Sequence, residues 1–519
     1  MQRVSPGAVM PGQTTTVHLR GERLAAATVV WTSFPAQTKQ ISAGAGEAVF
    51  SFQLPPEVQP GIGFARLAGS NGVSELVPLV IDDLPSLAAS GTNTAPTNAQ
   101  ALMLPVAVDG IASADRSDYF HFRGTKGQRL AIDLLAARLA SPLNPQVRLL
   151  DPQGHEAAYV NDDPGVGPDV RFAVKLPGTG GYLLEVRDVN FQGGGNFRYR
   201  LRLGDFPVAT GLFPAAVQPG RPTRLTALGR DVEKVSPFTM TVPAETRRAT
   251  RGVRYPGGVA SGFVSVVASD LPQMFEREPN DRATNATPFT VPAALNGRFD
   301  RARDVDYYSF DVVKDQRLLF TARTRSLALP CDVLLRVEKP DGSKVVESKI
   351  TEADDGLITN TFKEAGNYRL RVEELNRRGG PDLGYRVEVT PVEPGFEIEL
   401  DVDKVEAAPG GAFELKFGLR RREFKGAIKL SFPGLPEDCV IKGDKVAEDQ
   451  NTATARITLP AKLPPAQLIP FRVLAVATVN DRDVTNRVST LPALRKLWPR
   501  DRHLPLELDG QLVLGVRAK

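Results

Sequence analysis

The feature that most constrains the fold of this 519-residue chain is an internal duplication of two different units. A short unit opens with a Pro-x-x-x-x-Pro-Gly pattern at residues 6–12 and again at 214–220, and both copies end in Asp-Leu-Pro. A longer unit follows each copy of the short one. A chain that repeats two units in the same order is expected to fold as an array of domains rather than around one large core.

The longer unit matches itself in order over more than 100 residues. Asp-Tyr-Phe-His-Phe at 118–122 matches Asp-Tyr-Tyr-Ser-Phe at 306–310, Gly110 matches Gly297, and Tyr199 matches Tyr385. Short stretches of alternating apolar and polar residues are separated by turn signals every 8–15 residues, which is typical of antiparallel sandwiches. Residues 130–139 could pass for a helix, although their counterpart at 318–325 is better interpreted as a strand.

These patterns predict an all-β fold of tandem β-sandwiches, arranged as a string of beads. The expected domains are 1–85 and 207–272 for the short unit, 86–206 and 273–392 for the long unit, and a terminal domain at 393–519. The terminal domain repeats neither unit but is rich in alternating segments. Its residues 507–512 contain Asp-Gly, a sequence that favours a hairpin turn.

Composition excludes several classes of function. The 64 basic and 60 acidic residues leave a net charge of +4, which is too balanced for a concentrated nucleic-acid-binding face. Two cysteines, Cys331 and Cys439, and four histidines leave little material for zinc, iron–sulfur or c-type haem sites. No apolar run reaches the ~18 residues of a transmembrane helix. The cysteine count does not fix a redox state or a compartment.

The long unit resembles the bacterial pre-peptidase C-terminal domain. The second copy carries Glu-Pro-Asn-Asp at 278–281, Asp-x-Asp-Tyr-Tyr-x-Phe at 304–310 and Gly-x-Tyr-x-Leu-x-Val at 366–372. The first copy keeps the Asp-Tyr-Phe segment at 118–120 but lacks the opening Glu-Pro-Asn. The resemblance implies a jelly-roll-like sandwich that serves as a non-catalytic accessory module of secreted proteins, and it covers somewhat under half of the chain.

The short units resemble immunoglobulin-like modules through their Pro-x-x-x-x-Pro-Gly pattern. The terminal segment is also similar to such modules, on Phe-Lys-Gly-Ala-Ile-x-Leu at 424–430 and Gly-Leu-Pro at 434–436. The expected order is therefore immunoglobulin-like domains alternating with pre-peptidase C-terminal-like domains.

A calcium site in the second long unit is the sharpest chemical hypothesis. Calcium takes six to eight oxygen ligands, mostly from carboxylates and carbonyls. In calcium-binding relatives the linker before the sandwich carries such acids, and an acidic pair near the Asp-Tyr-Tyr strand completes the site. The resemblance places candidate ligands at Glu276, Glu278, Asn280, Asp281, Asp304 and Asp306. The alternative is a solvated acidic linker with an Asx turn.

The first long unit carries no comparable set. Ala89, Gly91, Asn93 and Thr94 stand where the second unit has its acids. A calcium site is therefore expected in the second copy alone.

The remaining candidate sites have competing structural explanations. The four histidines lie in four different units, and the chain has no GxSxG or HExxH motif. Basic clusters at 420–422 and 495–502 could contact an acidic glycan or a membrane surface, or form solvated loops. Aromatic side chains beside the two strand motifs could stack on sugars, or belong to the cores: Tyr119, Phe120, Tyr307 and Tyr308.

The sequence thus predicts a protein that is not an enzyme. We expect a secreted or envelope-associated multidomain binding, adhesion or spacer protein, located outside the cell, in the periplasm or in the envelope. Its partners would be a polysaccharide or an extracellular protein, with no nucleic acid. The alternatives are an accessory part of a secreted peptidase or other hydrolase, and a structural component of a bacterial extracellular complex. Because no signal peptide is visible, we expect the native start to lie upstream of Met1. No feature indicates an oligomeric state.

Overall fold

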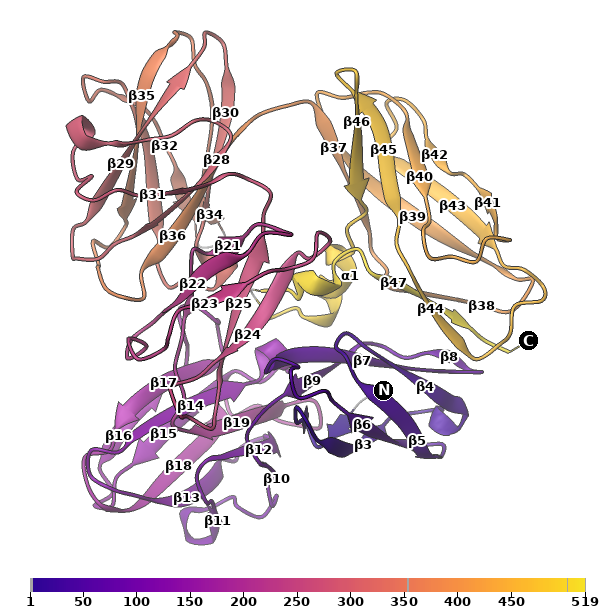
Figure 1. The fold of residues 1–519 in the computed structure, drawn as a ribbon. Helices are drawn as coiled ribbons and strands as arrows, with labels where there is room; N and C mark the ends of the chain where they lie inside the picture. Colours follow the sequence, from indigo (N-terminus) through magenta and orange to yellow (C-terminus); the bar gives the residue numbers. More distant parts are fainter. Residues whose placement is uncertain (1–2, 352–353, 502, 519) are drawn as a thin grey trace.

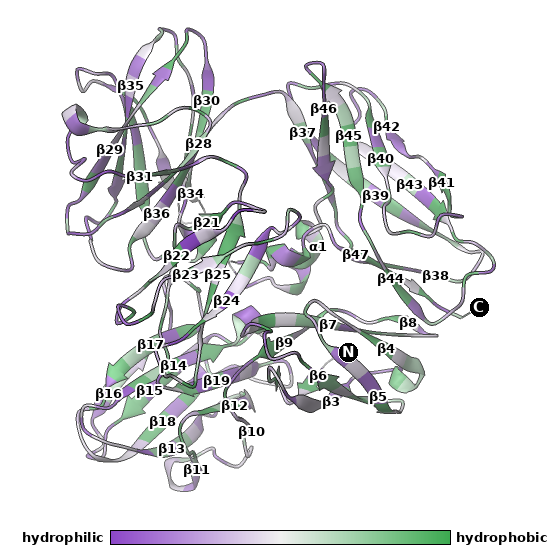
Figure 2. Cartoon of the chain, viewed as in Figure 1, coloured by the Kyte–Doolittle hydropathy of each residue, from purple (hydrophilic) through white to green (hydrophobic). Residues whose placement is uncertain are grey.

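The computed structural model describes residues 3–351, 354–501 and 503–518. About half of the chain is strand, arranged in many separate sheets, which confirms the all-β, multi-sandwich prediction (Figure 1). Hydrophilic and hydrophobic residues follow one another along the strands, as Figure 2 shows. In the strand Asp118–Gly124, for example, Phe120 and Phe122 are buried while His121 and Arg123 are exposed. This period of two buries one face of each strand and forms the cores.

The first short unit is a sandwich of two sheets. Its elements are β1 (Arg3–Ser5), β2 (Ala8–Val9), β3 (Thr14–Arg20), η1 (Leu24–Ala26), β4 (Ala27–Thr32), β5 (Gln37–Ala43), β6 (Glu47–Gln53), β7 (Gly61–Gly69), β8 (Gly72–Val73) and β9 (Val77–Ile81). One sheet has the order β1-β3-β6-β5 and the other β2-β9-β7-β4, with β8 paired to β7. Residues of both sheets meet in a single core.

The first long unit is a sandwich of two five-stranded sheets. Its elements are β10 (Ser86–Ala88), η2 (Pro96–Asn98), β11 (Gln100–Ala101), β12 (Val106–Ile111), β13 (Asp118–Gly124), β14 (Arg129–Leu135), η3 (Ala137–Leu139), β15 (Pro145–Leu150), β16 (Glu156–Val160), β17 (Val170–Lys175), β18 (Gly180–Asp188) and β19 (Arg198–Gly204). The orders are β10-β12-β19-β14-β17 and β11-β13-β18-β15-β16. The segment that could pass for a helix is thus strand β14 followed by one 3-10 turn.

The second short unit is a smaller sandwich with three strands in each sheet. Its elements are β20 (Gly211–Phe213), β21 (Ala216–Val217), β22 (Thr223–Leu228), β23 (Phe238–Met240), β24 (Arg248–Val253) and β25 (Gly262–Ala268). The orders β20-β22-β23 and β21-β25-β24 match β1-β3-β6 and β2-β9-β7 of the first short unit. The same strand order in both short units is what a duplication predicts.

The second long unit repeats the order of the first. Its elements are β26 (Gln273–Phe275), η4 (Ala283–Asn285), β27 (Thr287–Pro288), β28 (Ala293–Arg298), β29 (Val305–Val312), β30 (Arg317–Arg323), η5 (Arg325–Leu327), β31 (Val333–Glu338), β32 (Lys344–Glu347), β33 (Lys349–Thr351), β34 (Asp354–Thr361), β35 (Gly366–Glu374) and β36 (Gly384–Pro391). The orders are β26-β28-β36-β30-β34-β33 and β27-β29-β35-β31-β32. Apart from the added edge strand β33, each strand occupies the place of its counterpart in the first long unit.

The terminal unit contains three small sheets and a short helix. Its elements are β37 (Gly395–Leu400), β38 (Lys404–Ala407), β39 (Ala412–Arg422), β40 (Ile428–Ser431), β41 (Val440–Lys442), β42 (Lys445–Val446), β43 (Thr452–Thr458), β44 (Gln467–Phe471), β45 (Leu474–Val479), β46 (Arg482–Arg487), α1 (Leu491–Leu497), η6 (Leu506–Leu508) and β47 (Leu512–Val516). The hairpin predicted at 507–512 is wrong. A 3-10 turn precedes the Asp-Gly step, and β47 instead pairs with β38 and β44, because all five of its residues are buried between the two units that it joins.

The string-of-beads prediction is also wrong, because the terminal unit packs back against the first unit (Figure 1). Arg66 and Asp403 form a buried ion pair across this contact. Glu406 accepts a hydrogen bond from the backbone N–H of Val73 at 2.8 Å. Trp498, just after α1, is 1% exposed and meets Phe64 edge to face at 5.5 Å. The chain therefore closes on itself.

Both cysteines have free thiols, and Cys331 is buried. Cys331 lies in the core of the second long unit, whereas Cys439 packs against the core of the terminal unit. Of the helices that the structure describes, none has the length and apolar character of a membrane span.

The fold-back contact predicts a large effect of one buried charge. Replacing Asp403 by alanine leaves Arg66 buried without its ion-pair partner, which we expect to cost about 3–5 kcal/mol of unfolding free energy. Asp401 is the matched control, because its pair with Lys496 at 3.0 Å is exposed and should contribute at most about 1 kcal/mol. Chemical denaturation of Asp403→Ala and Asp401→Ala measures both changes. Equal stability of the two variants would contradict a buried fold-back contact.

Candidate metal site

The candidate site lies at the edge of the second long sandwich, where the linker from the preceding unit enters. Strand β26 runs parallel to β28 and pairs Phe275 with Asn296, so the next residue, Glu276, passes beside the end of β28. The backbone N–H of Arg298 donates to Glu276 Oε1 at 2.9 Å. This pairing places Glu276 against the edge of the sandwich.

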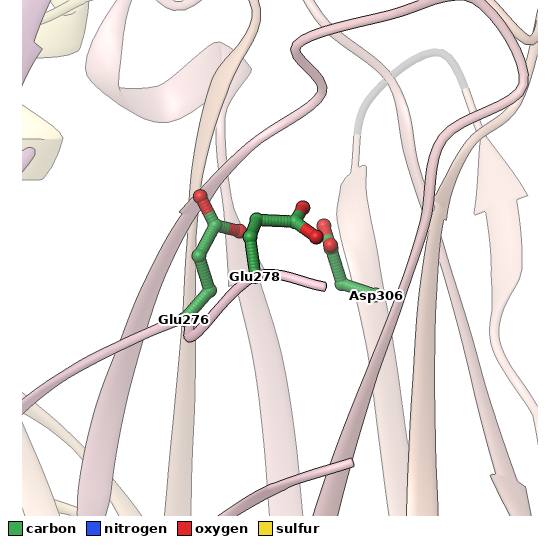
Figure 3. Close-up of side chains that lie close together, drawn as sticks. All are labelled: Glu276, Glu278 and Asp306. Atoms are coloured by element: carbon green, nitrogen blue, oxygen red, sulfur yellow. The ribbon is translucent and has the colours of Figure 1, made fainter. Parts of the chain in front are cut away.

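Three of the six predicted ligands converge. One carboxylate oxygen from each of Glu276, Glu278 and Asp306 lies within 4.8 Å of the other two. Figure 3 shows these carboxyl groups turned toward one another, two from the linker and one from β29. Carboxylates that approach so closely repel one another unless protons or a cation compensate their charge.

Asn280 lies buried beside this cluster. Its backbone carbonyl accepts from the N–H of Tyr307 at 2.9 Å, which fixes the linker to β29. Its side chain is 0% exposed, and neither Oδ1 nor Nδ2 has a partner at normal hydrogen-bond distance among the described residues, although it lies near enough to Asp306 to lower the pKa of that carboxyl. Asp306 Oδ1 is buried in the same unpartnered state. Buried polar atoms without protein partners are uncommon in native proteins, and a water or an ion can satisfy them.

The first long unit provides a comparison within the same chain. Asn93 occupies the place of Asn280, because its carbonyl accepts from Tyr119 as that of Asn280 accepts from Tyr307. Asn93 is equally buried, but its Nδ2 donates to the Tyr119 carbonyl at 3.1 Å and its Oδ1 accepts from Ser90 Oγ at 3.2 Å. The copy without acids thus satisfies its asparagine with protein groups, whereas the acidic copy does not.

Two buried tyrosines and a glycine complete the surroundings, and none of them was among the predicted metal ligands. Tyr385 donates to Asp306 Oδ2 at 2.7 Å, and its hydroxyl lies 2.8 Å from that of Tyr308. A Cβ on Gly297 would stand 2.4 Å from Glu276 Oε2, so a side chain there would displace the carboxylate. The repeat contained a signal for two of them, since Gly297 and Tyr385 match Gly110 and Tyr199. In both copies, however, that glycine also makes room for the tyrosine.

The electrostatics of the cluster follow from burial and like charge. Burial, reinforced by the charge of Asp306, raises the pKa of Glu276 to about 9. Burial also raises the pKa of Asp306 well above its usual range. The pKa of Glu278 is raised by burial and by the nearby charges of Asp304 and Asp281. In the absence of a cation, protons must therefore remain on this cluster at neutral pH.

The other two predicted ligands lie to one side. Asp281 forms an exposed ion pair with Arg301. Asp304 accepts from the backbone N–H of Asp300 at 2.9 Å, and its Oδ1 lies 3.5 Å from the Arg301 guanidinium. The Arg301 guanidinium therefore compensates part of the charge of both carboxylates. Asp304 Oδ1 is nevertheless buried without a hydrogen-bond partner among the described residues, like Asp306 Oδ1.

The donor set suits a hard cation. Three carboxylates and one amide oxygen are the ligand types that calcium takes, with water completing six to eight positions. Neither histidine nor cysteine belongs to the group, so the softer metals that prefer nitrogen or sulfur are disfavoured. A bound cation would be the largest local charge and would favour the ionised form of every carboxylate.

The four aromatic side chains considered for sugar stacking differ in their burial. Phe120 and Tyr308 are completely buried in the two long cores, so they do not stack on sugars. Tyr119 and Tyr307 are partly buried, and Tyr119 donates to Glu185 at 3.2 Å.

Comparison with known proteins finds only distant likenesses. No family model matches the chain, and no curated protein matches it significantly. Among solved structures, it is similar to the pre-peptidase C-terminal domain of a collagenase from Bacillus anthracis, at 21% identity over 21% of this chain and 99% of that domain, with a TM-score of 0.17. This match spans too little of the chain to test the prediction of two copies.

Two multidomain structures are also similar to longer parts of the chain. One is the M60 catalytic domain with two CBM51 domains of ZmpB from Clostridium perfringens, at 10% identity over 69% of this chain and 52% of that one, with a TM-score of 0.13. The other is domains 1–6 of the surface layer protein SbsC, at 11% identity over 73% and 52%, with a TM-score of 0.14. Neither likeness is close enough to indicate a shared function.

The raised pKa values predict how stability depends on pH without calcium. Because the folded chain keeps protons on Glu276 that the unfolded chain releases, its unfolding free energy should fall as pH rises from about 4.5 toward 9. Glu276→Gln removes this titration and should flatten the curve over the same range. Urea denaturation in chelator at several pH values measures both slopes. Parallel curves for the two proteins would contradict a buried, proton-holding Glu276.

Proposed function

We propose that this chain is a non-catalytic, secreted or envelope-associated binding and spacer protein whose second long sandwich binds calcium. One observation carries the calcium assignment: three carboxylates converge beside Asn280, a fully buried side chain without partners. The equivalent asparagine, Asn93, of the copy that lacks the linker acids has protein partners. A cation on the acidic side would satisfy the oxygens of the group and remove the repulsion between them.

The position of the site supports a role in holding domains. Phe275, next to Glu276, packs against Phe213 of the preceding short sandwich, with ring centres 5.9 Å apart. Arg298, whose N–H binds Glu276, stacks on the same Phe213 ring at 4.1 Å and donates to Thr226 at 2.9 Å. Calcium at Glu276 would therefore stiffen the joint between the two sandwiches as well as the fold of the second.

Calcium should raise the stability of the full chain by mass action. At a free concentration one hundred times the dissociation constant, the expected gain is about 2.7 kcal/mol of unfolding free energy relative to chelator. Asp306→Ala should abolish the gain. Because that change also removes the acceptor of the Tyr385 hydroxyl, Glu278→Gln is the second variant, since Glu278 is exposed and loses only charge.

The matched control is Asp118→Ala in the first long unit. Asp118 accepts from Tyr199 at 2.6 Å, as Asp306 accepts from Tyr385, but no acids surround it. This variant should lose stability and still gain from calcium. Differential scanning calorimetry in calcium and in chelator measures all four proteins. Equal melting temperatures of the unmodified chain in calcium and in chelator would contradict the calcium site and support the interpretation of a solvated acidic linker.

A further inference from the structure

A second candidate site lies between the second long sandwich and the end of the terminal unit, away from the acidic cluster. It is a cleft of about 490 Å³, within the size range of ligand sites. Strand β30, turn η5 and strand β34 form one wall, and Arg495 of α1 with residues 499–501 forms the other. The residues that matter are Arg323, Arg325, Arg495, Arg500 and Asp501.

Two arginines of the terminal wall carry uncompensated charge. Arg495 Nη1 donates to the backbone carbonyls of Trp498, at 3.2 Å, and Asp501. Arg500 Nη1 donates to the carbonyl of Pro142. Within the described residues neither guanidinium forms an ion pair with a carboxylate. The Nε and Nη2 donors of both, which together grip an oxyanion in a fork, have no partner there.

The opposite wall adds no excess positive charge. Arg323 pairs with Glu388 at 3.1 Å, and Arg325 pairs with Asp332 at 2.5 Å. Asp355 is occupied as well, because it accepts the N–H groups of Arg325 and Ser326 at the start of η5. The excess positive charge of the cleft therefore comes from Arg495 and Arg500.

Asp501, which also lies near Arg138 and Arg248, adds a different kind of contact to the cleft. Its side chain is 5% exposed, and its Oδ1 accepts from the backbone N–H of His503 at 2.8 Å. No described residue donates to its Oδ2. Burial raises the pKa of this carboxyl to about 7, so near neutral pH it can accept or donate a hydrogen bond.

We propose that this cleft binds a segment of an acidic polysaccharide. A uronate carboxylate or a sulfate ester would lie on Arg495 and Arg500, while a neighbouring sugar hydroxyl would bond Asp501. A ligand that brings only negative charge would leave Asp501 without a favourable partner, whereas an acidic sugar carries an oxyanion and hydroxyl groups on the same ring. The inference rests on the proposed binding role and not on calcium.

Titration calorimetry of the full chain tests the proposal with four ligands. Oligogalacturonate supplies carboxylates alone and dextran sulfate supplies sulfates alone, so these two arms identify the oxyanion. Binding of either acidic glycan, together with no binding of dextran, supports the proposal. Equal binding of dextran would overturn it, because charge would then be irrelevant. Tighter binding of polyglutamate than of both glycans would overturn it in favour of an acidic peptide.

Substitutions place the binding in this cleft. Arg500→Gln should lower the affinity for the acidic glycan about tenfold, which is the usual loss for one charged hydrogen-bond donor. Arg495→Gln is the second variant should the first disturb the contact with Pro142. Arg420→Gln, an exposed arginine on β39 of the same unit, is the matched control and should leave affinity within twofold. Unchanged affinity in both cleft variants would overturn the assignment.

Repeating the titrations in chelator separates this site from the calcium site. The cleft should bind the glycan in both conditions, since none of its residues belongs to the acidic cluster. Loss of glycan binding in the cleft variants alone, with the calcium-dependent melting intact, is the expected pattern. A failure of glycan binding would leave the calcium result standing, and the reverse also holds.

Discussion

The arrangement of the first three sandwiches depends on one buried carboxylate, Asp82, in the linker that leaves the first unit. Arg200 and Arg202, both on β19 of the next sandwich, donate to it at 2.8 and 3.0 Å. Burial alone would raise the pKa of Asp82, but the charges of Arg202 and Arg200 outweigh it and lower that pKa to about 2. Arg202 also donates to the Ser261 carbonyl and stacks on Phe263 at 4.1 Å. This one cluster of charged side chains therefore fixes the first long sandwich against the short sandwiches that precede and follow it.

The corresponding joint of the second repeat lacks this clamp. Ser269 stands in the place of Asp82, and Glu388 in the place of Arg202. Arg386, the counterpart of Arg200, donates to Ser269 at 2.8 Å and to Gln273 at 2.6 Å, so neutral groups replace the linker carboxylate. This is the joint at which the acidic cluster lies. In the first repeat, permanent charges hold the joint between the two units. In the second repeat, the carboxylates of the acidic cluster at the joint remain uncompensated without a cation.

Much of the fold was predictable from sequence, because it follows from local periodicity and from the repeat. Alternating apolar residues and frequent turns indicate strands, and the repeated motifs predict the same strand order in both copies. The closure of the chain was not predictable, because it depends on isolated residues such as Arg66 and Asp403, 337 positions apart. Nor did the sequence exclude a hairpin at Asp-Gly, since burial of β47 between two units, rather than turn preference, decides its pairing.

The candidate metal site shows the same division between local pattern and spatial context. Glu276, Glu278 and Asp306 were predictable as a group, because the linker acids precede a strand whose motif recurs. Sequence could not separate them from Asp281 and Asp304, since both types are acids at similar spacing. What separates them is Arg301, which lies beside Asp281 and Asp304. Among the described residues, Glu276, Glu278 and Asp306 form no ion pair with a basic side chain. The proposed cation would compensate this shortage of positive charge.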